Sequence, residues 1–357
     1  MRKIYLIRHA MPCLPYGVRV CVGRTNLPLG TLGRLQAALL GVAFKDTPLT
    51  AVYCSNLLRS RQTATPIGGP VTEILGLEEM DAGEWDGLTF DEIGVRWPTI
   101  YEQRGKDPSV SPPGAETRES GQKRFMAAVR RVLSESIGDI VIVAHASVMQ
   151  TLFCNVLGLP LDNARGIKLP YGSVSLLSYE DSRFFVHSIG VSPHPSPNVF
   201  FCEQLLVAAV PPNIAAHCKA VAKEALRIAE NLIRAGALLN VELILAASML
   251  HDIARMEEDH AAVGAAQMHA LGYPEIAEII RQHHSLDDVS RIDEAAVVFI
   301  ADKCIQGTKK VTLLERFENS LGKCSGAEAR MAHGKRFQAA QLTAARINQL
   351  CRRDVTI

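Results

Sequence analysis

Hydrophobic residues follow two different patterns along this chain of 357 residues. In the first half, short apolar runs such as residues 4–7 and 140–143 alternate with segments whose apolar positions recur at helical spacing. This alternation predicts a three-layer α/β sandwich, in which helices cover both faces of a mostly parallel sheet. In the second half only helical spacing remains, over residues 214–235, 242–254, 274–284, 294–304 and 327–351. We therefore expect the second half to be all-α.

A proline-rich stretch separates the two patterns. Residues 192–198 read Ser-Pro-His-Pro-Ser-Pro-Asn. Proline fixes the backbone and lacks a hydrogen-bond donor, so neither a helix nor a central strand is favoured there. We predict one domain over residues 1–192, a linker over 193–211 and a second domain over 212–357. A chain of this length is long enough for two domains, each with its own core.

Each of the two apolar runs named above is followed by a histidine. Arg8 and His9 follow residues 4–7, and His145 closely follows residues 140–143. Functional residues of α/β sheets gather at the carboxyl ends of the strands, so we expect both histidines at one site. An arginine beside a histidine is suited to binding phosphate next to a nucleophile, although a histidine that merely ends a core strand is also common.

Composition narrows the classes of function. There are 38 Lys and Arg against 37 Asp and Glu, with a formal charge of +1 and no run of like charge. We therefore expect neither a nucleic-acid partner nor a membrane-surface partner. No apolar stretch reaches membrane-spanning length, and we expect no cleaved signal. The nine cysteines form no Cys-X-X-Cys pair, which is typical of reduced thiols in a cytoplasmic protein.

The first half resembles the histidine phosphatases, the phosphoglycerate-mutase-like superfamily. Five segments occur in the order of that family, namely residues 3–10, 23–37, 52–64, 77–87 and 140–147. The stretch is more similar to the short phosphatases, including α-ribazole phosphatase, than to the mutases, because only a modest segment separates Gly87 from Gly138. The resemblance implies a phosphoglycerate-mutase-like fold and hydrolysis of a phosphorylated small molecule.

This resemblance also implies the catalytic residues. His9 is expected to attack phosphorus and form a phosphohistidine that water hydrolyses, with no cofactor. His145 is expected to share the phosphoryl oxygens and to be cationic when substrate is bound. Glu79 matches the position of the family's proton donor. Other carboxylates lie close to it in sequence and leave that assignment open, namely Glu78, Asp81 and Glu84.

Phosphate binding is expected to come from arginines, which stay protonated and offer several planar donors. The resemblance selects Arg8, Arg59 and the loop residue Arg24. Arg61 is an alternative to Arg59, because helical spacing lets only one of the two point into the site. A site that recognises phosphate without turnover is a further alternative, although the complete set of residues argues against it.

The second half resembles the HD domain, a helical metal-dependent phosphohydrolase fold, over about residues 210–310. The matching residues are, in order, His217, His251, Asp252, His260, His283 and Asp302. Imidazoles and carboxylates on facing helices can enclose divalent ions. The first four-ligand site would use His217, His251, Asp252 and Asp302. A second ion would be held by His260 and His283 with Asp252 bridging, and His284 could replace His283.

Two functional hypotheses follow. In the first, the protein is a bifunctional phosphohydrolase, in which the HD domain hydrolyses a phosphate ester or nucleotide with Fe, Mn, Zn, Ni or Mg. In the second, only the first domain is an enzyme, and the HD half is a metal- or nucleotide-binding regulatory or structural module. Both hypotheses predict a phosphorylated small-molecule substrate, and both leave room for an oligomer.

Overall fold

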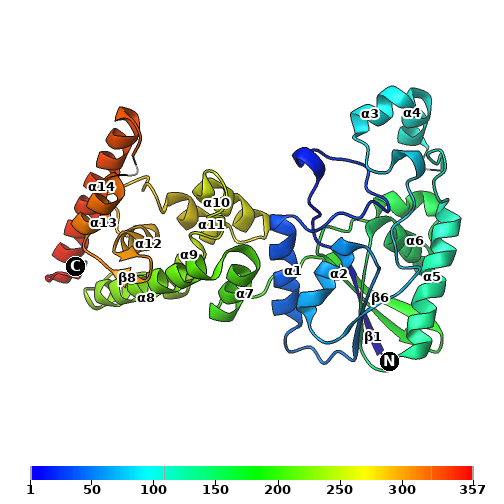
Figure 1. Cartoon of the computed structure of the whole chain (residues 1–357). Helices are drawn as coiled ribbons and strands as arrows, with labels where there is room; N and C mark the ends of the chain where they lie inside the picture. Colours follow the sequence, from blue (N-terminus) through cyan, green and yellow to red (C-terminus); the bar gives the residue numbers. More distant parts are fainter. Residues whose placement is uncertain (1, 108, 323, 356–357) are drawn as a thin grey trace. The chain divides into compact units, whose positions relative to one another are not determined.

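The structure is a computed structural model that describes residues 2–107, 109–322 and 324–355. The chain divides into two compact units, Met1–His194 and Pro195–Ile357 (Figure 1). The first contains a six-stranded sheet flanked by helices, and the second is helical apart from one two-stranded hairpin. The expected fold classes, an α/β sandwich followed by a helical region, are confirmed.

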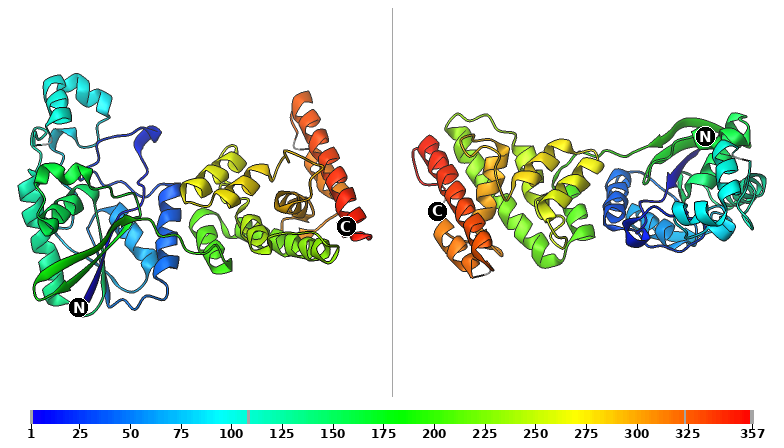
Figure 2. Two further views of the ribbon diagram at one scale, coloured as in Figure 1. Left: turned by 180° about the vertical axis from the view of Figure 1, so that it is seen from behind. Right: turned by 90° about the horizontal axis from the view of Figure 1, so that it is seen from above.

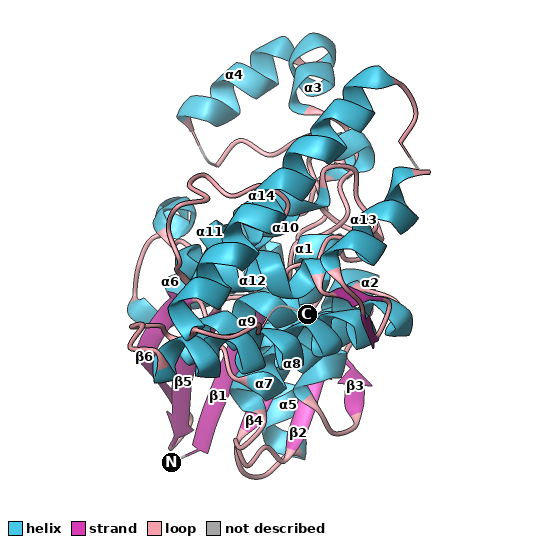
Figure 3. Ribbon diagram, turned by 90° about the vertical axis from the view of Figure 1, so that its left-hand side faces the viewer, coloured by secondary structure: helices cyan, strands magenta, loops and turns pink. Residues whose placement is uncertain are grey.

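The sheet of the first unit has the strand order β3-β2-β4-β1-β5-β6 (Figure 3). Strands β3, β2, β4 and β1 are parallel, whereas β5 runs antiparallel to both β1 and β6. The strands are β1 (Arg2–Arg8), β2 (Ala51–Cys54), β3 (Val71–Glu73), β4 (Ile140–Ala144), β5 (Val174–Glu180) and β6 (Arg183–Val191). Asp181 and Ser182 turn the β5–β6 hairpin with positive φ angles of 48° and 63°, as two-residue hairpin loops require.

Alternating strand residues contact helices on opposite faces of the sheet. Ile4 and Leu6 of β1 belong to the core shared with α5 (Arg118–Glu135) and α6 (Ala146–Leu157). Ile7 belongs to the core on the other face, with α1 (Thr31–Phe44) and α2 (Leu58–Ala64). Figure 2 shows these helix pairs on the two sides of the sheet. Strand β4 is buried along its whole length, which explains its unbroken apolar sequence.

The segment between β3 and α5 contains two short helices, α3 (Phe90–Arg96) and α4 (Pro98–Lys106). A capping box begins α3, since Thr89 and Glu92 each accept the other's backbone N–H. Pro98 begins α4, at a position where its missing N–H is not needed. Short 3₁₀ helices complete the unit, at η1 (Pro15–Gly17), η2 (Thr65–Ile67), η3 (Gly83–Trp85) and η4 (Leu161–Gly166).

The second unit is built around α12, whose residues 295–303 are all buried. Helices α8, α9, α11 and α14 contact it. The elements are α7 (Val199–Ala209), α8 (Pro212–Arg234), α9 (Val241–Leu250), α10 (His260–Ala270), α11 (Pro274–Gln282), α12 (Glu294–Lys303), β7 (Ile305–Gln306), β8 (Lys309–Lys310), α13 (Leu313–Leu321) and α14 (Ala327–Cys351). Among the described residues, no helix is long and apolar enough to cross a membrane.

The structure departs from the sequence prediction in two places. Part of the predicted linker 193–211 is the helix α7, because Asn198 caps its first turn and Phe201 and Leu205 are fully buried within the second unit. The predicted all-α half also contains the β7–β8 hairpin, where Gly307 adopts a positive φ of 61°. Both features depend on tertiary packing or on a single turn residue, which periodicity alone does not reveal.

Candidate active site and metal centre

The carboxyl ends of β1 and β4 bring the two predicted histidines together. The strands pair in parallel with Arg8 opposite Ala144, so His9 and His145 are the next residues on neighbouring strands. The His9 amide donates to the Ala144 carbonyl at 2.9 Å, and the two imidazole rings lie 4.9 Å apart between centroids. Both side chains are buried. The centre of the sheet therefore fixes their relative position.

The His9 ring has a defined orientation. Its Nδ1 lies 2.8 Å from the Ala10 carbonyl oxygen, so Nδ1 carries the proton and donates it. Nε2 keeps its lone pair, which accepts a hydrogen bond from Nε of Arg59 at 3.3 Å. Burial, and then the charges of Arg59 and Arg8, lower the pKa of His9 well below its usual value. A neutral imidazole with an unprotonated Nε2 is the form that can attack phosphorus.

Arg59 and Arg61 leave α2 in different directions. Arg59 has no exposed surface, and besides His9 it contacts the carbonyl oxygens of Gly23 and Thr25, both at 2.7 Å. Arg61 is about half exposed and pairs with Glu73 at 3.1 Å, on strand β3. Of the two arginines, Arg59 is therefore the one beside the nucleophile.

Arg8 is positioned by the segment before β5. Its Nη1 donates to the Leu169 carbonyl at 2.6 Å, and its guanidinium carbon lies 3.7 Å from the centroid of the Tyr171 ring. That ring is also 5.5 Å from the His9 ring between centroids. Burial lowers the pKa of Arg8 from its usual value. Nothing in the sequence marked Tyr171, because it lies far along the chain from both partners and outside the matching segments.

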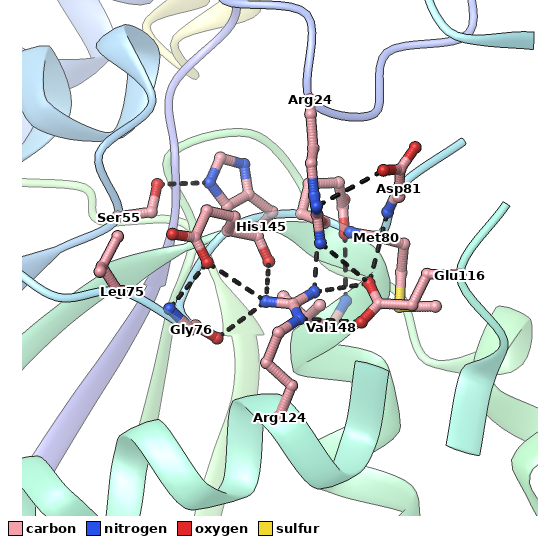
Figure 4. Close-up of polar contacts among 12 residues, drawn as sticks. Arg24, Ser55, Leu75, Gly76, Met80, Asp81, Glu116, Arg124, His145 and Val148 are labelled. Carbon is pink, nitrogen blue, oxygen red and sulfur yellow. Dashed lines mark hydrogen bonds and ion pairs between the residues drawn. The ribbon is translucent and has the colours of Figure 1, made fainter. Parts of the chain in front are cut away.

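His145 is oriented by a serine that the sequence analysis did not select. Nε2 of His145 lies 2.7 Å from Oγ of Ser55, which follows β2 and is fully buried (Figure 4). Nδ1 of His145 is buried and has no partner among the described residues. Burial, followed by the charges of His9 and Arg59, lowers the pKa of His145 well below its usual value. The ring is therefore neutral in this state, whereas we expected a cation with substrate bound.

Glu79 contacts the helix that His145 begins. Its carboxylate accepts the backbone N–H of Ser147 at 3.1 Å and of Val148 at 3.2 Å, in the first turn of α6. The N-terminus of a helix stabilises a carboxylate, because its first N–H groups lack partners within the helix. Glu79 is only 6% exposed. This contact places it one helical turn from His145.

The other three candidate acids have different surroundings. Glu78 accepts the Gly76 amide at 2.7 Å and pairs with Arg124 at 3.4 Å. Asp81 pairs with Arg24 at 3.4 Å (Figure 4). Glu84 is exposed. Glu79 is thus the one of these four acids whose carboxylate reaches the backbone beside His145.

Arg24 lies between two carboxylates rather than against His9. It is 42% exposed, and it approaches Asp81 at 3.4 Å and Glu116 at 3.5 Å. The loop that carries it is fixed by Asp86, whose carboxylate accepts the backbone N–H groups of residues 23, 24 and 25, each at 2.8 Å. Asp86 was missed in the sequence, although it lies inside a matching segment, because an acid that orders a remote loop leaves no local pattern.

The predicted ligands of the second unit converge from five of its helices. His217 lies on α8, His251 and Asp252 directly follow α9, His260 begins α10, His283 follows α11, and Asp302 lies on α12. Except for His260 and His217, which are partly buried, these side chains are nearly inaccessible to solvent. Two groups could each hold an ion, one of His217, His251 and Asp252 and one of His260, His283 and His284.

Three of the imidazoles are oriented by the same kind of hydrogen bond to a backbone carbonyl. Nδ1 of His251 lies 2.7 Å from the Ser248 carbonyl oxygen, and Nδ1 of His283 lies 2.6 Å from that of Ile280. His217 makes the corresponding contact with the carbonyl of residue 307 at 2.8 Å. A histidine that donates Nδ1–H to a backbone carbonyl presents Nε2 as a ligand, which is the usual arrangement around protein-bound metals.

The Nε2 atoms face the two aspartates. His217 and His251 lie 3.3 and 3.6 Å from Oδ1 of Asp302. His260 and His283 lie 3.2 and 3.6 Å from Oδ1 of Asp252, which therefore stands between the two groups. Nε2 of His251, Nε2 of His283 and Oδ1 of Asp252 are buried, and none of them has a hydrogen-bond partner among the residues that the structure describes. Buried lone pairs aimed at one another fit a cation between them, so these residues suit a divalent metal.

His284 and Lys303 extend this centre. His284 Nε2 lies 2.8 Å from His260 Nε2, so His283 and His284 both reach the site, rather than one in place of the other. This is because both follow the last turn of α11, where helical geometry no longer separates their directions.

The buried Lys303 donates to Asp302 at 2.6 Å. Although burial alone would raise the pKa of Asp302, Lys303 and the neighbouring histidines hold it well below its usual value.

Comparison with known proteins agrees with this division. The family model of the histidine phosphatase superfamily (branch 1) matches residues 4–192, and that of the HD domain matches residues 214–306. Both resemblances expected from the sequence are thereby confirmed. The glucosyl-3-phosphoglycerate phosphatase of Mycolicibacterium vanbaalenii is 30% identical over 176 residues, which cover 46% of this chain and 77% of the relative.

Solved structures match about half of this chain. The YhfR protein of Bacillus stearothermophilus is 28% identical with a TM-score of 0.50, and the match covers 53% of this chain and 96% of that protein. The α-ribazole phosphatase from Shigella flexneri is 21% identical with a TM-score of 0.49, and the match covers 54% of this chain and 98% of that protein.

Proposed function

This chain belongs to the histidine phosphatase superfamily (branch 1), and on that premise we propose that its first unit hydrolyses a small-molecule phosphomonoester through a phosphohistidine on His9. One observation carries the proposal. The buried His9 presents an unprotonated Nε2 beside the guanidinium of Arg59, with His145 at 4.9 Å between ring centroids. A nucleophile beside fixed cationic donors is what attack on a phosphate dianion requires, because the charge must be offset first.

The first step uses His9 and Glu79. When a phosphate enters, Nε of Arg59 turns its hydrogen bond from His9 to a phosphoryl oxygen, and the freed Nε2 lone pair attacks phosphorus in line. The N–P bond forms while the ester P–O bond breaks, and its electron pair leaves with the alcohol oxygen. That oxygen takes a proton from Glu79, which then becomes the carboxylate bound to the first turn of α6.

The second step returns the enzyme to its starting state. A water molecule enters the place of the alcohol, and the Glu79 carboxylate accepts its proton as its oxygen attacks phosphorus. The N–P bond breaks, and its electron pair returns to Nε2 of His9, so phosphate leaves and Glu79 is protonated again. Microscopic reversibility assigns the same residue to both proton transfers.

Four groups hold the phosphoryl oxygens in this proposal. Arg8 and Arg59 supply charged donors. Nδ1 of His145, which has no partner among the described residues, supplies a third donor, with Ser55 holding the opposite ring nitrogen. The negative charge of the phosphate raises the pKa of His145, which favours the cationic form. Arg24 has to leave Asp81 or Glu116 before it reaches a phosphoryl oxygen, so we assign it a smaller contribution.

For the second unit we propose a metal-dependent phosphohydrolase of the HD type. His217, His251, Asp252 and Asp302 would hold one divalent ion. Asp252, His260 and His283 would hold a second, and we add His284 to that group. Bound metal would supply an acidified water and offset phosphoryl charge. The chain's own contribution is orientation, since backbone carbonyls fix the histidine rings and Lys303 holds Asp302.

The test is phosphate release from a panel of phosphomonoesters and nucleotides, with and without a chelator. We expect chelator-resistant activity that His9→Ala abolishes, and a separate chelator-sensitive activity that Asp252→Ala abolishes. If His9→Ala leaves every activity intact, the phosphohistidine proposal fails. If metal is bound but no chelator-sensitive activity appears with any substrate, the proposal of a second enzyme fails and the HD unit is a regulatory or structural module.

A further inference from the structure

Two helices of the second unit end at a cavity of about 1030 Å³, which we call the distal cavity. The last turns of α8 and α14 line it, together with Ser290 and Ile292, which precede α12. Among the described residues, no aspartate or glutamate lines the distal cavity, but four arginines do, namely Arg234, Arg346, Arg352 and Arg353. A concave surface lined by cations attracts anions.

The distal cavity is separate from the proposed metal centre. Along α8, His217 and Asn231 are about 21 Å apart, because an α-helix rises about 1.5 Å per residue. Along α14, Arg336 lines the cavity that contains His217 and Asp252, whereas Arg346 lines the distal cavity about 15 Å further on. The four arginines therefore do not belong to the site proposed for the HD reaction.

Carboxylates balance only part of the charge of these arginines. Among the described residues, the one ion pair that the four make joins Arg234 to Glu230 at 3.6 Å, and both side chains are at least half exposed. Arg346 also acts on Asp288, because the hydrogen bonds of Ser290, followed by the charge of Arg346, lower the pKa of Asp288. Exposed ion pairs contribute little, so most of the positive charge stays available to a ligand.

Neutral contacts fix the segment that carries two of the arginines. Asn231 is only 7% exposed, and it accepts a hydrogen bond from Arg353 and donates one to the Arg227 carbonyl at 2.7 Å. Arg227 in turn donates to the carbonyl of Val355. Between these contacts Arg352 adopts a positive φ of 51°, which is strained for an arginine and which glycine adopts without steric cost. The fold therefore holds a cation in a strained backbone conformation beside the distal cavity.

We propose that the four arginines bind a small-molecule anion with a chain of phosphate groups, such as inorganic triphosphate or a nucleoside triphosphate. A guanidinium binds phosphate oxygens through two parallel hydrogen bonds, and several guanidinium groups from separate segments suit an anion with several charges. A cavity of this size also holds a molecule as large as a nucleotide. This site is distinct from both proposed catalytic centres, and the inference depends on neither activity.

The test is titration calorimetry of the metal-free full chain with inorganic triphosphate. We expect a binding event that Arg346→Glu and Arg352→Glu each weaken at least about tenfold, the effect of losing a charged hydrogen bond. Lys335→Glu reverses the charge of an exposed residue of α14 outside the cavity, and it should leave that event within about twofold. Binding that Arg59→Ala removes belongs to the first unit instead.

Arg352→Gly separates ligand binding from folding. Because glycine tolerates the positive φ, its melting temperature should not fall, whereas triphosphate binding should weaken about tenfold. If the arginines only stabilise the ends of the helices, the glutamate variants will lower the melting temperature and leave triphosphate binding unchanged, which would overturn the proposal.

Two further ligands define the class of anion. ATP that binds more tightly than triphosphate shows that the nucleoside is also recognised, and equal affinities show that the phosphate chain suffices. Citrate should bind more weakly than triphosphate. If citrate binds equally well, or if no binding event depends on Arg346 and Arg352, the polyphosphate site is disproved while both proposed activities stand.

Discussion

The two units place buried histidines in opposite electrostatic surroundings. In the first unit His9 lies against the guanidinium of Arg59, and its pKa is lowered by burial and by the neighbouring cations. In the second, His251 and His283 lie 3.6 Å from Asp302 and Asp252 respectively. The histidines of the first unit are therefore suited to an anionic ligand and those of the second to a cation.

The same local hydrogen bond orients histidines in both sites. His9 donates Nδ1–H to a backbone carbonyl at 2.8 Å, and His251 does so at 2.7 Å, so each presents Nε2 to its site. Orientation alone therefore does not distinguish a nucleophile from a metal ligand. The charge of the neighbours does, because arginines around a neutral imidazole attract phosphate, whereas carboxylates around it attract a divalent ion.

Removing the arginine beside His9 should have the largest effect on the activity of the first unit. Arg59→Ala is expected to lower chelator-resistant kcat/KM about a thousandfold, as loss of a donor to transition-state charge does. Arg59→Lys should recover only part of the loss, because an ammonium cannot bind as a planar fork. The matched control is Arg61→Ala, two residues further along the same helix. Its kcat/KM should stay within about twofold of the wild-type value. Equal losses in the two alanine variants would contradict our assignment of Arg59.

Removing a carboxylate should break the second site alone. Asp252→Ala is expected to weaken metal binding by more than about a hundredfold, the upper range for changes to residues that only support ligands. Metal content measured by mass spectrometry checks this, with His269→Ala, an exposed histidine of α10, as the control. Chelator-resistant activity should stay unchanged. A change in its KM or kcat would instead favour the hypothesis of a regulatory HD unit.

Substitution of Ser55 tests how much the neutral hydrogen-bond partner of His145 contributes to the site of the first unit. Ser55→Ala should lower kcat about tenfold with little change in KM, because His145 loses the 2.7 Å contact that directs its Nδ1 to the phosphate. Ser55→Thr keeps the hydroxyl and should restore most of the activity. If the alanine variant loses activity only through a lower melting temperature, Ser55 has a structural role and does not position His145.

The smallest expected effect is a shift in the pH profile of the chelator-resistant activity. A base that must be unprotonated loses activity as pH falls through its pKa, and the pKa of His9 lies below 6.5 because of burial, Arg59 and Arg8. The acid limb of the chelator-resistant kcat/KM profile, set by protonation of His9, should therefore lie below pH 6.5. Arg8→Gln removes one of these charges and should move the fall upward by less than about one unit. An acid limb centred above pH 6.5 in the wild type would contradict a neutral His9.

Sequence patterns identified the residues whose positions depend on local structure. The convergence of His9 and His145 could be predicted because each directly follows a buried strand. The convergence of the histidines and aspartates of the second unit could be predicted because they match an ordered set of helical positions. Ser55, Asp86 and Tyr171 could not, because each acts on a residue more than 30 positions away through a tertiary contact.

Trapping the covalent intermediate tests the central claim most directly. Wild-type protein with chelator would be mixed with a phosphomonoester that it hydrolyses and quenched in alkali within milliseconds, and its peptides would be mapped by mass spectrometry. We predict one phosphoryl group on His9, absent from His9→Ala and unaffected by Asp252→Ala. Turnover with no phosphorylated histidine, or a phosphoryl group that forms only when metal is present, would contradict a metal-independent nucleophile at the carboxyl end of β1.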